Sequence, residues 1–552
     1  MATSSVFPLR WAGPAATRPP LVLTAAQKLL LPLGVLLFDL LFWRQGVGLN
    51  LAMYTLLAGA ALLTTRPRAA WRSGYFRLLL AGTGLSCAAV LLYGSAVAGL
   101  ACVASLAMLL GYANQPHLKQ LALALLTSLH SALMVATGLP QLLAHRPKWL
   151  DRTERVVWYV RLLVVPALVL LVFHVLFSLA NPVYADLTQR ALAAAANWVG
   201  EWLAALLPVD LVAHGLFLLL GLVLTAGALL RVPVPGLAQW EARFAEFIRR
   251  RRDGVASFGV RNPDFRAGRF RVADLRKEYL AALAVFGLVN LLLLAVNVID
   301  IQWLWFGFVP APDFDLAQFV HEGTYVLIFS ILLAMGIVLW FFRRNLNFYQ
   351  PGLPALRWGA TVWVLQNAVL AASVGLRNYY YISHMGLAYK RVGVCFFLLL
   401  TLFGLGTILL KIWQRRSTFS LLRLNSLAAY AVLLLLALGN WEIWIAGYNL
   451  SSRQERPRKD PRHLDLGFLL NMPGRVLPTL VRQRAALNDY PHLAVRAPYQ
   501  PQATRLTPAA AQRALDARVA DWLTHYQTQA SWHDWTYADW AAYRALTAPP
   551  RR

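Results

Sequence analysis

The sequence is poor in charge and lacks the short motifs that mark common enzymes. Only 14% of its 552 residues are charged, against about 25% in a typical soluble domain, while 58% are hydrophobic. We find no Walker loop, no dinucleotide-binding glycine motif, no HExxH, no GxSxG and no protein-kinase set. The composition excludes an ordinary soluble protein. No motif assigns a catalytic residue. The missing motifs do not decide whether the protein is an enzyme, but they weigh against it.

Cysteine is also scarce. Cys87, Cys102 and Cys395 each lie inside an apolar run. They form no CxxC pair, and no histidine stands at metal-ligand spacing from them. A disulfide framework and a zinc site are therefore not indicated, and we expect three buried thiols and neither a metal nor a cofactor.

Acidic residues are few relative to basic ones. Asp and Glu number 25 against 52 Lys and Arg, which gives a formal net charge of +27. Such a surplus points to nucleic acid only where it covers a folded globular surface. Here most of it lies in short loops between apolar runs, where it sets membrane orientation and contacts anionic lipid. We therefore expect a lipid bilayer with anionic headgroups as the partner, and no nucleic acid.

Apolar runs near the ~20 residues that cross a bilayer recur along most of the chain. The candidate spans are 26–43, 47–64, 77–93, 94–112, 120–143, 156–180, 210–230, 279–300, 319–342, 357–376, 390–412 and 421–445. The predicted fold class is all-α: a polytopic transmembrane helical bundle of 11–12 spans with a small, mainly helical C-terminal extramembrane domain.

The same pattern divides the chain into five parts. We predict a flexible N-terminal segment at 1–25, transmembrane helices at 26–230 and again at 279–445, a basic cytoplasmic loop at 231–278, and a soluble C-terminal domain at 446–552. The loop contains Arg249, Arg250, Arg251 and Arg252, which we expect to contact lipid headgroups. In the C-terminal domain, Thr507-Pro508 predicts the start of one helix and Thr536 the cap of a second.

Basic loops alternate with loops that are nearly free of Lys and Arg. The positive-inside rule places the basic ones in the cytoplasm, namely 144–155, 231–278, 343–357 and 411–423. Loops 181–209 and 301–318 hold a single basic residue between them, Arg190, and belong outside. Because successive spans alternate in direction, the last span then ends outside, and the C-terminal domain lies outside the cytoplasm.

The N-terminal quarter does not fit this alternation of cytoplasmic and outside loops. Loop 65–77 is also basic, and it can be cytoplasmic only if one early run does not cross. The candidates are the first run, which contains Asp39, and the run at 120–143.

Polar residues gather at the ends of the spans that face outside. They are Asp300, His321, Glu322, Arg377, Asn378, His384, Arg391 and Glu442. Ionisable groups at membrane depth cost about 2.5–3.5 kcal/mol each on insertion scales, so they pair with one another or face a cavity. We predict that Glu322 pairs with Arg377. We also predict that Asp300, His321, His384 and Glu442 line a polar pocket that opens beneath the C-terminal domain. The alternative is that each simply reaches headgroups and water.

Asp39 is a carboxylate inside an apolar run. Such a group acts as a proton relay or a substrate contact, or it snorkels from a helix end. His130, His174 and His214 are single histidines on apolar helices, and we interpret them as core residues.

Several short motifs resemble a known family. They are Phe38-Asp39-Leu40-Leu41-Phe42-Trp43 followed by Gly48-Leu49-Asn50, then Ala180-Asn181-Pro182-Val183-Tyr184, Glu322-Gly323, Arg377 with Tyr380-Ile382, Met385-Gly386-Leu387, Arg391, Ile445-Ala446-Gly447-Tyr448-Asn449-Leu450 and Leu464-Asp465-Leu466. From about 29 to 480 the chain resembles a bacterial polytopic inner-membrane family of unknown function, domain 4173 and its sister family 4153. The resemblance implies a multi-pass bacterial cell-membrane protein and no reaction. The sequence departs from the family pattern at His384 and Ala388, where Tyr and Thr are expected.

Three functions follow from these observations. The favoured one is a non-enzymatic structural, sensory or interaction protein of the envelope, with residues 451–552 contacting an extracytoplasmic partner. The second is a transporter or translocation component for a small or lipid-linked substrate. The third is a membrane enzyme acting on a lipid-linked phosphate, with Asp39, Asp300 or Glu442 as base and Arg377 or Arg391 on the phosphate.

Overall fold

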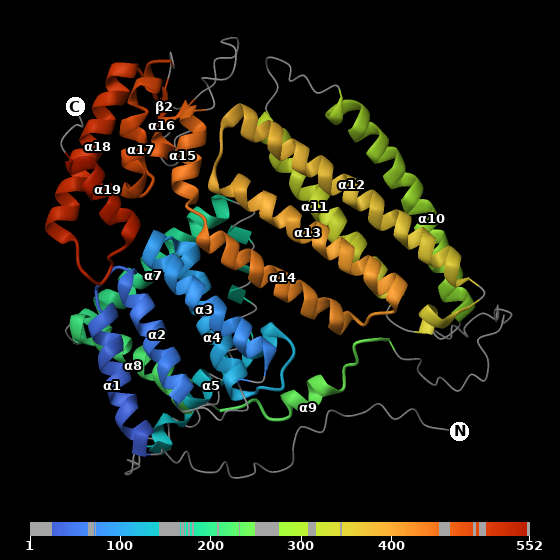
Figure 1. The fold of residues 1–552 in the computed structure, drawn as a ribbon, viewed down its shortest axis with the longest axis horizontal. Coiled ribbons are helices and arrows are strands. Elements are labelled where there is room, and N and C mark those ends of the chain that lie inside the picture. The colour runs from blue at the N-terminus through green and yellow to red at the C-terminus, as the bar shows by residue number, and fades with distance from the viewer. Residues whose placement is uncertain are drawn as a thin grey trace.

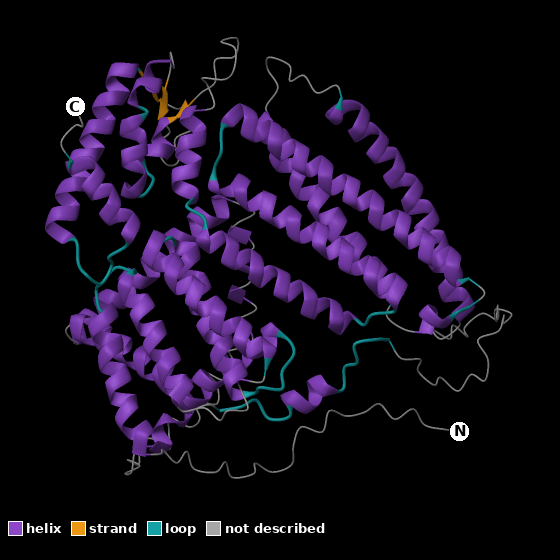
Figure 2. Cartoon of the chain, in the orientation of Figure 1, coloured by secondary structure: helices purple, strands orange, loops and turns teal. Residues whose placement is uncertain are grey.

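The protein, seen here in a computed structural model, is built almost entirely of helices (Figure 1; Figure 2). The structure describes residues 25–64, 73–142, 182–206, 209–230, 232–248, 275–306, 316–342, 345–350, 352–451, 464–489, 493–495 and 504–548, with Trp71 and a few positions between 166 and 178. The predicted segment 1–25 and the run at 156–180 therefore lie almost wholly outside the described residues.

The N-terminal helices form one bundle. Its members are α1 (Ala25–Phe42), α2 (Leu49–Thr64), α3 (Gly74–Tyr93), α4 (Ala96–Asn114), α5 (Leu121–Leu142) and α8 (Val209–Leu230), with α7 (Pro182–Leu206) before α8. α3 and α4 form a hairpin, and α1 packs against α8. Ala89, Ala98 and Ala101 are fully buried in the hairpin. Such small side chains let membrane helices approach closely.

A second group of helices follows. It contains α10 (Leu275–Asp300) continued by a short π-helix η2 (Ile301–Trp305), then α11 (Leu316–Phe341), η3 (Asn345–Phe348), α12 (Leu353–Met385) and α13 (Tyr389–Gln414). Its core contains Phe286, Phe342 and Trp363. α14 (Thr418–Leu438) joins the two groups, since it contacts α13 on one side and α3 and α4 on the other.

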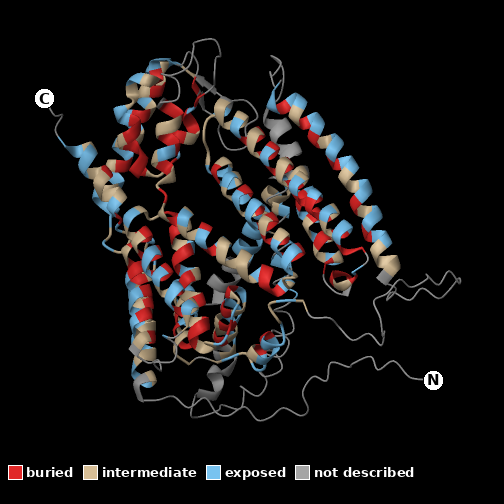
Figure 3. Cartoon of the chain, turned by 45° about the vertical axis from the view of Figure 1, so that its right-hand side comes forward, coloured by how far each residue is buried: buried red, intermediate tan, exposed pale blue. Residues whose placement is uncertain are grey.

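Within the described residues, most apolar runs become helices close to the predicted bounds, and the run at 357–376 lengthens to α12 (Leu353–Met385). Among the described residues, seven helices are long and apolar enough to cross a membrane, and three shorter apolar stretches add to them. Outward faces carry exposed leucines, such as Leu288 at 71%, while buried positions face the helix contacts (Figure 3). The prediction of an all-α, polytopic membrane bundle is confirmed. The last run is divided, because α14 ends at Leu438 and α15 (Trp441–Ser451) starts a new helix.

The cysteines differ from the expectation at one position. Cys87 and Cys102 are buried thiols, with their sulfur atoms 3.6 Å apart. Cys395 is exposed, so the prediction of a buried thiol is wrong there. The reason is that α13 has an outward-facing side, which Cys395 shares with Leu399, itself 52% exposed.

α5 lies along one end of the bundle instead of rising through it (Figure 1). Ser131, ten positions into this helix, donates its hydroxyl to the carbonyl of Gly227 and accepts the backbone N–H of Val232, which lies just beyond the end of α8. Thr127 also bonds Gln115, which follows α4. Ser128, one turn before Ser131, donates to the carbonyl of Ala107, about two turns before the end of α4. The middle of α5 therefore contacts the last two turns of α4 and the last turn of α8. The run that does not cross stays a prediction, and we use 120–143 as that run in the proposed orientation below.

The C-terminal segment folds over the opposite end. Its elements are β1 (Leu464–Asp465), α16 (Leu466–Leu470), η4 (Gly474–Val476), α17 (Leu477–Arg482), η5 (Arg484–Asp489), β2 (Leu493–Val495), β3 (Thr504–Leu506), α18 (Pro508–Gln529) and α19 (Tyr537–Thr547). β1 pairs parallel with β2, and β2 pairs antiparallel with β3. Thr507 and Thr536 cap α18 and α19, as predicted. The backbone N–H groups of Leu49 and Asn50 bond the carbonyls of Trp535 and His533, which docks this segment on α2.

Candidate functional site

Asp300 and Arg377 form a buried ion pair between α10 and α12. Arg377 donates from a terminal guanidinium nitrogen to Asp300 Oδ1 at 2.7 Å, and the side chains are 10% and 8% exposed. Asp300 ends α10, immediately before the π-helix. The side chains of His321 and Glu322 lie outside the described residues, so the Glu322–Arg377 pair stays a prediction. The structure adds Asp300 as a direct partner of Arg377.

Asn378 and Arg391 hold the turn between α12 and α13. The Asn378 amide donates to the carbonyl of Arg391 at 3.1 Å and to Cys395 Sγ at 3.2 Å. Arg391 donates to the carbonyls of Met385 and Gly386, and its guanidinium lies 4.0 Å from the ring centroid of Tyr381. Arg391 thus ties this turn to its own helix. The side chain of His384 lies outside the described residues.

Asn449 of α15 completes the same turn. Its Oδ1 accepts the N–H of Leu387 at 2.5 Å, and its Nδ2 donates to the Leu387 carbonyl at 2.9 Å. Gly386 has a φ of +81°, and a Cβ there would lie 2.5 Å from Asn449 Oδ1. The family-like motifs around Gly386 and Asn449 are therefore contact partners.

Gly386→Ala should destabilise the protein by about 1–3 kcal/mol, because an L side chain would be strained at this φ and would displace Asn449. Gly393→Ala is the matched control, since that position is helical and a Cβ there meets nothing within 4 Å. Thermal unfolding of the detergent-solubilised protein measures both changes. Equal midpoints for the two variants would contradict the assignment.

Glu442 pairs with Arg475 and is not placed with Asp300 and Arg377. Arg475, in η4, reaches Glu442 of α15 at 3.2 Å and Asp539 of α19 at 3.7 Å. The side chains of Arg475 and Glu442 are 7% and 8% exposed. Thr536 donates to Asp539 at 2.7 Å. We call Glu442, Arg475 and Asp539 the hub.

The hub rests on the turn between α3 and α4. Gly94 ends α3 with a φ of +56°, and a Cβ added there would lie 2.5 Å from Thr536 Cγ2 and 3.5 Å from a terminal nitrogen of Arg475. The hairpin, α15 and the C-terminal segment thus meet at one guanidinium. Sequence reasoning found Glu442 and missed Arg475, because no local pattern distinguishes this arginine from others in the basic C-terminal segment.

Asp39 also has a partner that sequence reasoning missed. Asp39 Oδ1 lies 2.7 Å from His214 Nε2 on α8, and the side chains are 25% and 35% exposed. Trp43 stacks on His214 with ring centroids 4.2 Å apart. Each polar group on these apolar helices thus has a partner, which gives both a structural reason to be there.

A cavity of about 170 Å³ lies in the N-terminal bundle between α1, α2 and α8. Its lining is mostly leucine and alanine, and its polar atoms include the hydrogen-bonded hydroxyls of Tyr54 and Thr225, 3.2 Å apart. A hydrocarbon chain suits such walls better than a phosphate does. Within the described part of the chain, no three His, Cys, Asp or Glu side chains gather as a transition-metal site would require.

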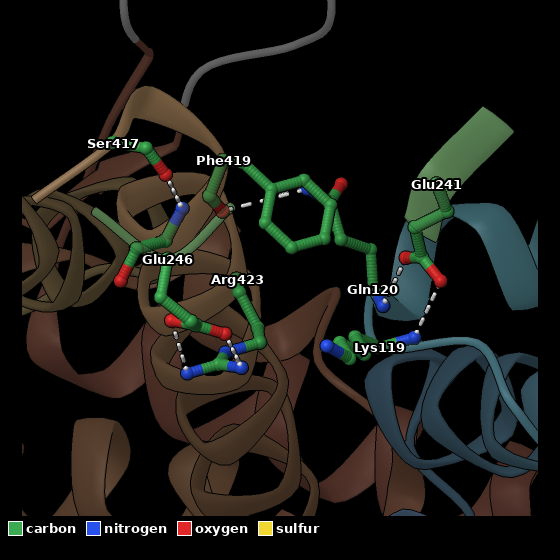
Figure 4. Close-up of polar contacts among 8 residues, drawn as sticks. Lys119, Gln120, Glu241, Glu246, Ser417, Phe419 and Arg423 are labelled. Carbon is green, nitrogen blue, oxygen red and sulfur yellow. Dashed lines mark hydrogen bonds and ion pairs between the residues drawn. The ribbon is translucent and has the colours of Figure 1, made fainter. Parts of the chain in front are cut away.

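Residues 236–248, which we call the strap, lie across the end of the bundle opposite the hub and include α9 (Leu237–Ala242). Glu246 forms a two-pronged ion pair with Arg423 of α14, and Glu241 accepts the backbone N–H groups of Lys119 and Gln120 before α5 (Figure 4). The strap thus joins the two helix groups. Arg249, Arg250, Arg251 and Arg252 follow it directly and lie outside the described residues.

Burial raises the pKa of Glu241, and the two N–H donors oppose that shift. A carboxyl whose pKa is higher in the folded state binds its proton more tightly there, so its contribution to stability is complete below the unfolded value of about 4.3 and is lost as pH rises through the folded value. Glu241→Gln should flatten the pH dependence of the thermal unfolding midpoint between the unfolded and the folded pKa of this carboxyl. Asp521→Asn, at an exposed position on α18, should leave the dependence unchanged. If Glu241→Gln kept it as well, another group would have to cause it.

The comparisons with known proteins identify one family. The family model described as Domain of unknown function (DUF4153) matches residues 76–483, more than half of the chain. This range includes Asp300, Arg377, Arg391, Glu442 and Arg475, and it excludes Asp39 and Asp539. No curated protein and no solved structure matches the chain. The chain is a membrane protein of unknown function and belongs to the DUF4153 family.

Proposed function

We propose that the protein is a non-enzymatic interaction protein of the bacterial inner membrane, which presents its C-terminal domain outside the cytoplasm to an envelope partner. The observation that carries this proposal is the hub. A guanidinium of the C-terminal segment is almost fully buried between α15, α19 and the α3–α4 turn. Such a contact holds the domain against the membrane helices as a fixed platform.

Charge supports the proposed orientation. The strap end carries Lys119, Arg357, Arg415, Arg416 and Arg423, whereas Arg44, Lys390 and Arg391 lie at helix ends toward the hub. The positive-inside rule assigns the strap end to the cytoplasm. In this orientation the run at 120–143 does not cross, so the early and late basic loops lie on the same side. Residues 451–552 would then face the periplasm, where their basic surplus suits an acidic partner or anionic headgroups.

The reactivity of introduced cysteines toward a membrane-impermeant reagent distinguishes a fixed platform from a transporter with a water-filled path. Ser373 is fully buried on α12, one turn before Arg377, and accepts a hydrogen bond from Trp305. In a variant without native cysteines, Ser373→Cys in intact cells should resist a membrane-impermeant thiol reagent. Trp532→Cys in the C-terminal segment, where the tryptophan is 50% exposed, should react from outside.

Each result has a separate meaning. Rapid labelling at position 373 would show a water-filled route and would favour the transporter. Failure to label position 532 from outside, with labelling after permeabilisation, would overturn the orientation. Turnover of a lipid-linked phosphate by the purified protein, lost in Arg391→Ala, would favour the enzyme.

A further inference from the structure

Arg357 and Arg415 lie close together at the strap end of the second helix group. Arg357 belongs to the second turn of α12, and its guanidinium carbon lies 5.6 Å from the ring centroid of Trp413 on α13. Arg415 ends α13, and its guanidinium carbon lies 5.1 Å from the ring centroid of Phe348 in η3, just before α12. Each arginine thus reaches across to the neighbouring element. The two positive charges are near enough to repel each other.

This arginine pair has no counter-charge among the described residues. No carboxylate there forms an ion pair with either arginine, and the Nε atoms of both are buried without an acceptor. The carboxylates of the strap are engaged elsewhere, since Glu246 holds Arg423 and Glu241 accepts two backbone N–H groups before α5. Two like charges held together raise each other's energy. A bound anion would relieve that repulsion and supply acceptor oxygens.

The start of α12 adds positive charge at the same place. This helix begins at Leu353, and its N-cap, Gly352, offers no side-chain bond to the first N–H groups. A long side chain on a helix lies over the turn that precedes its own position, so the Arg357 side chain covers this first turn. Free N–H groups at a helix start attract anions. The helix start and the two guanidiniums therefore favour a ligand of the same charge.

Two tryptophans set the depth of the site in the membrane. Trp358 and Trp413 are 59% and 44% exposed, and their rings meet edge to face with centroids 5.5 Å apart. Exposed tryptophan near the ends of membrane helices prefers the headgroup region of the bilayer. Trp358 directly follows Arg357, and Trp413 is two residues before Arg415. Both arginines therefore lie at the level of lipid phosphates.

The chemistry of the donors selects the ligand. The planar fork of a guanidinium matches the oxygens of a phosphate. A zwitterionic lipid would bring an ammonium group next to the second guanidinium, whereas an anionic lipid brings no added positive charge. We propose that Arg357 and Arg415 bind the phosphate of an anionic phospholipid of the phosphatidylglycerol class. This site is independent of the proposed platform role, because it needs only the adjoining leaflet and no envelope partner.

Thermal unfolding of the purified full chain tests the site. In a nonionic detergent, phosphatidylglycerol should raise the unfolding midpoint by about 2–4 °C over phosphatidylcholine with the same acyl chains, and the rise should saturate with lipid concentration. Arg357→Gln and Arg415→Gln should each remove most of the rise. Arg416→Gln is the matched control, since the Arg416 side chain bonds Gln414 and lies over Phe247; it should keep the rise.

A count of bound lipid keeps the proposal falsifiable if a variant unfolds too early to measure. In native mass spectrometry, the double variant Arg357→Gln, Arg415→Gln should retain phosphatidylglycerol about tenfold less than Arg416→Gln does. Equal midpoints with the two lipids, or equal retention by the two variants, would overturn the proposal. Glycerol phosphate at the same concentration should give no rise. If it gives the same rise as phosphatidylglycerol, a free phosphate ester occupies the site and the lipid is not its ligand.

Discussion

Arg475→Met should release the C-terminal segment from the membrane helices. The substitution leaves Glu442, only 8% exposed, without its cation. Removing one partner of a buried ion pair costs about 3–5 kcal/mol, because the other charge stays buried and uncompensated. Hydrogen exchange of the Leu49 and Asn50 amides measures the release, since these groups donate to the carbonyls of Trp535 and His533 only while the segment is docked.

Two variants test whether the charge causes this effect. Arg484→Met removes an exposed pair with Asp516, in which the side chains are 43% and 52% exposed, and it should cost less than about 1 kcal/mol. The double variant Glu442→Leu, Arg475→Met removes both buried charges and should restore most of the amide protection. Leu49 and Asn50 amides that stay protected in Arg475→Met would show that the hub does not hold the segment.

Local and compositional signals predicted much of this fold. Apolar runs set the membrane helices, because their length and hydropathy need no knowledge of neighbours. The caps at Thr507 and Thr536 were also predictable, since a cap depends on the next three residues only. Loop charge predicted that one early run does not cross, but it did not distinguish 120–143 from the first run. The bonds from Ser131 to Gly227 and Val232 depend on tertiary packing, which loop charge does not report.

The pairings of the site were less predictable. Asp39 and His214 are 175 residues apart, and the sequence around one of them does not indicate that it contacts the other. Arg377 and Asp300 were both expected in one polar cluster, but depth in the membrane does not decide which carboxylate of a cluster meets a given arginine. That choice depends on the parallel packing of α10 and α12, which is a property of the whole bundle.

Arg377→Met should destabilise the bundle by about 3–5 kcal/mol, because Asp300 would remain buried with no counter-ion. The double variant Asp300→Leu, Arg377→Met should recover most of that loss, since apolar residues of similar volume replace the pair without leaving a charge. Denaturant-induced unfolding in detergent measures both, and Tyr379→Phe, at a position 56% exposed on the same helix, should be nearly neutral. If the double variant is no more stable than Arg377→Met, then Asp300 is not the carboxylate that Arg377 balances. The predicted partner Glu322 then becomes the one to test, and Glu322→Leu, Arg377→Met should give the recovery instead.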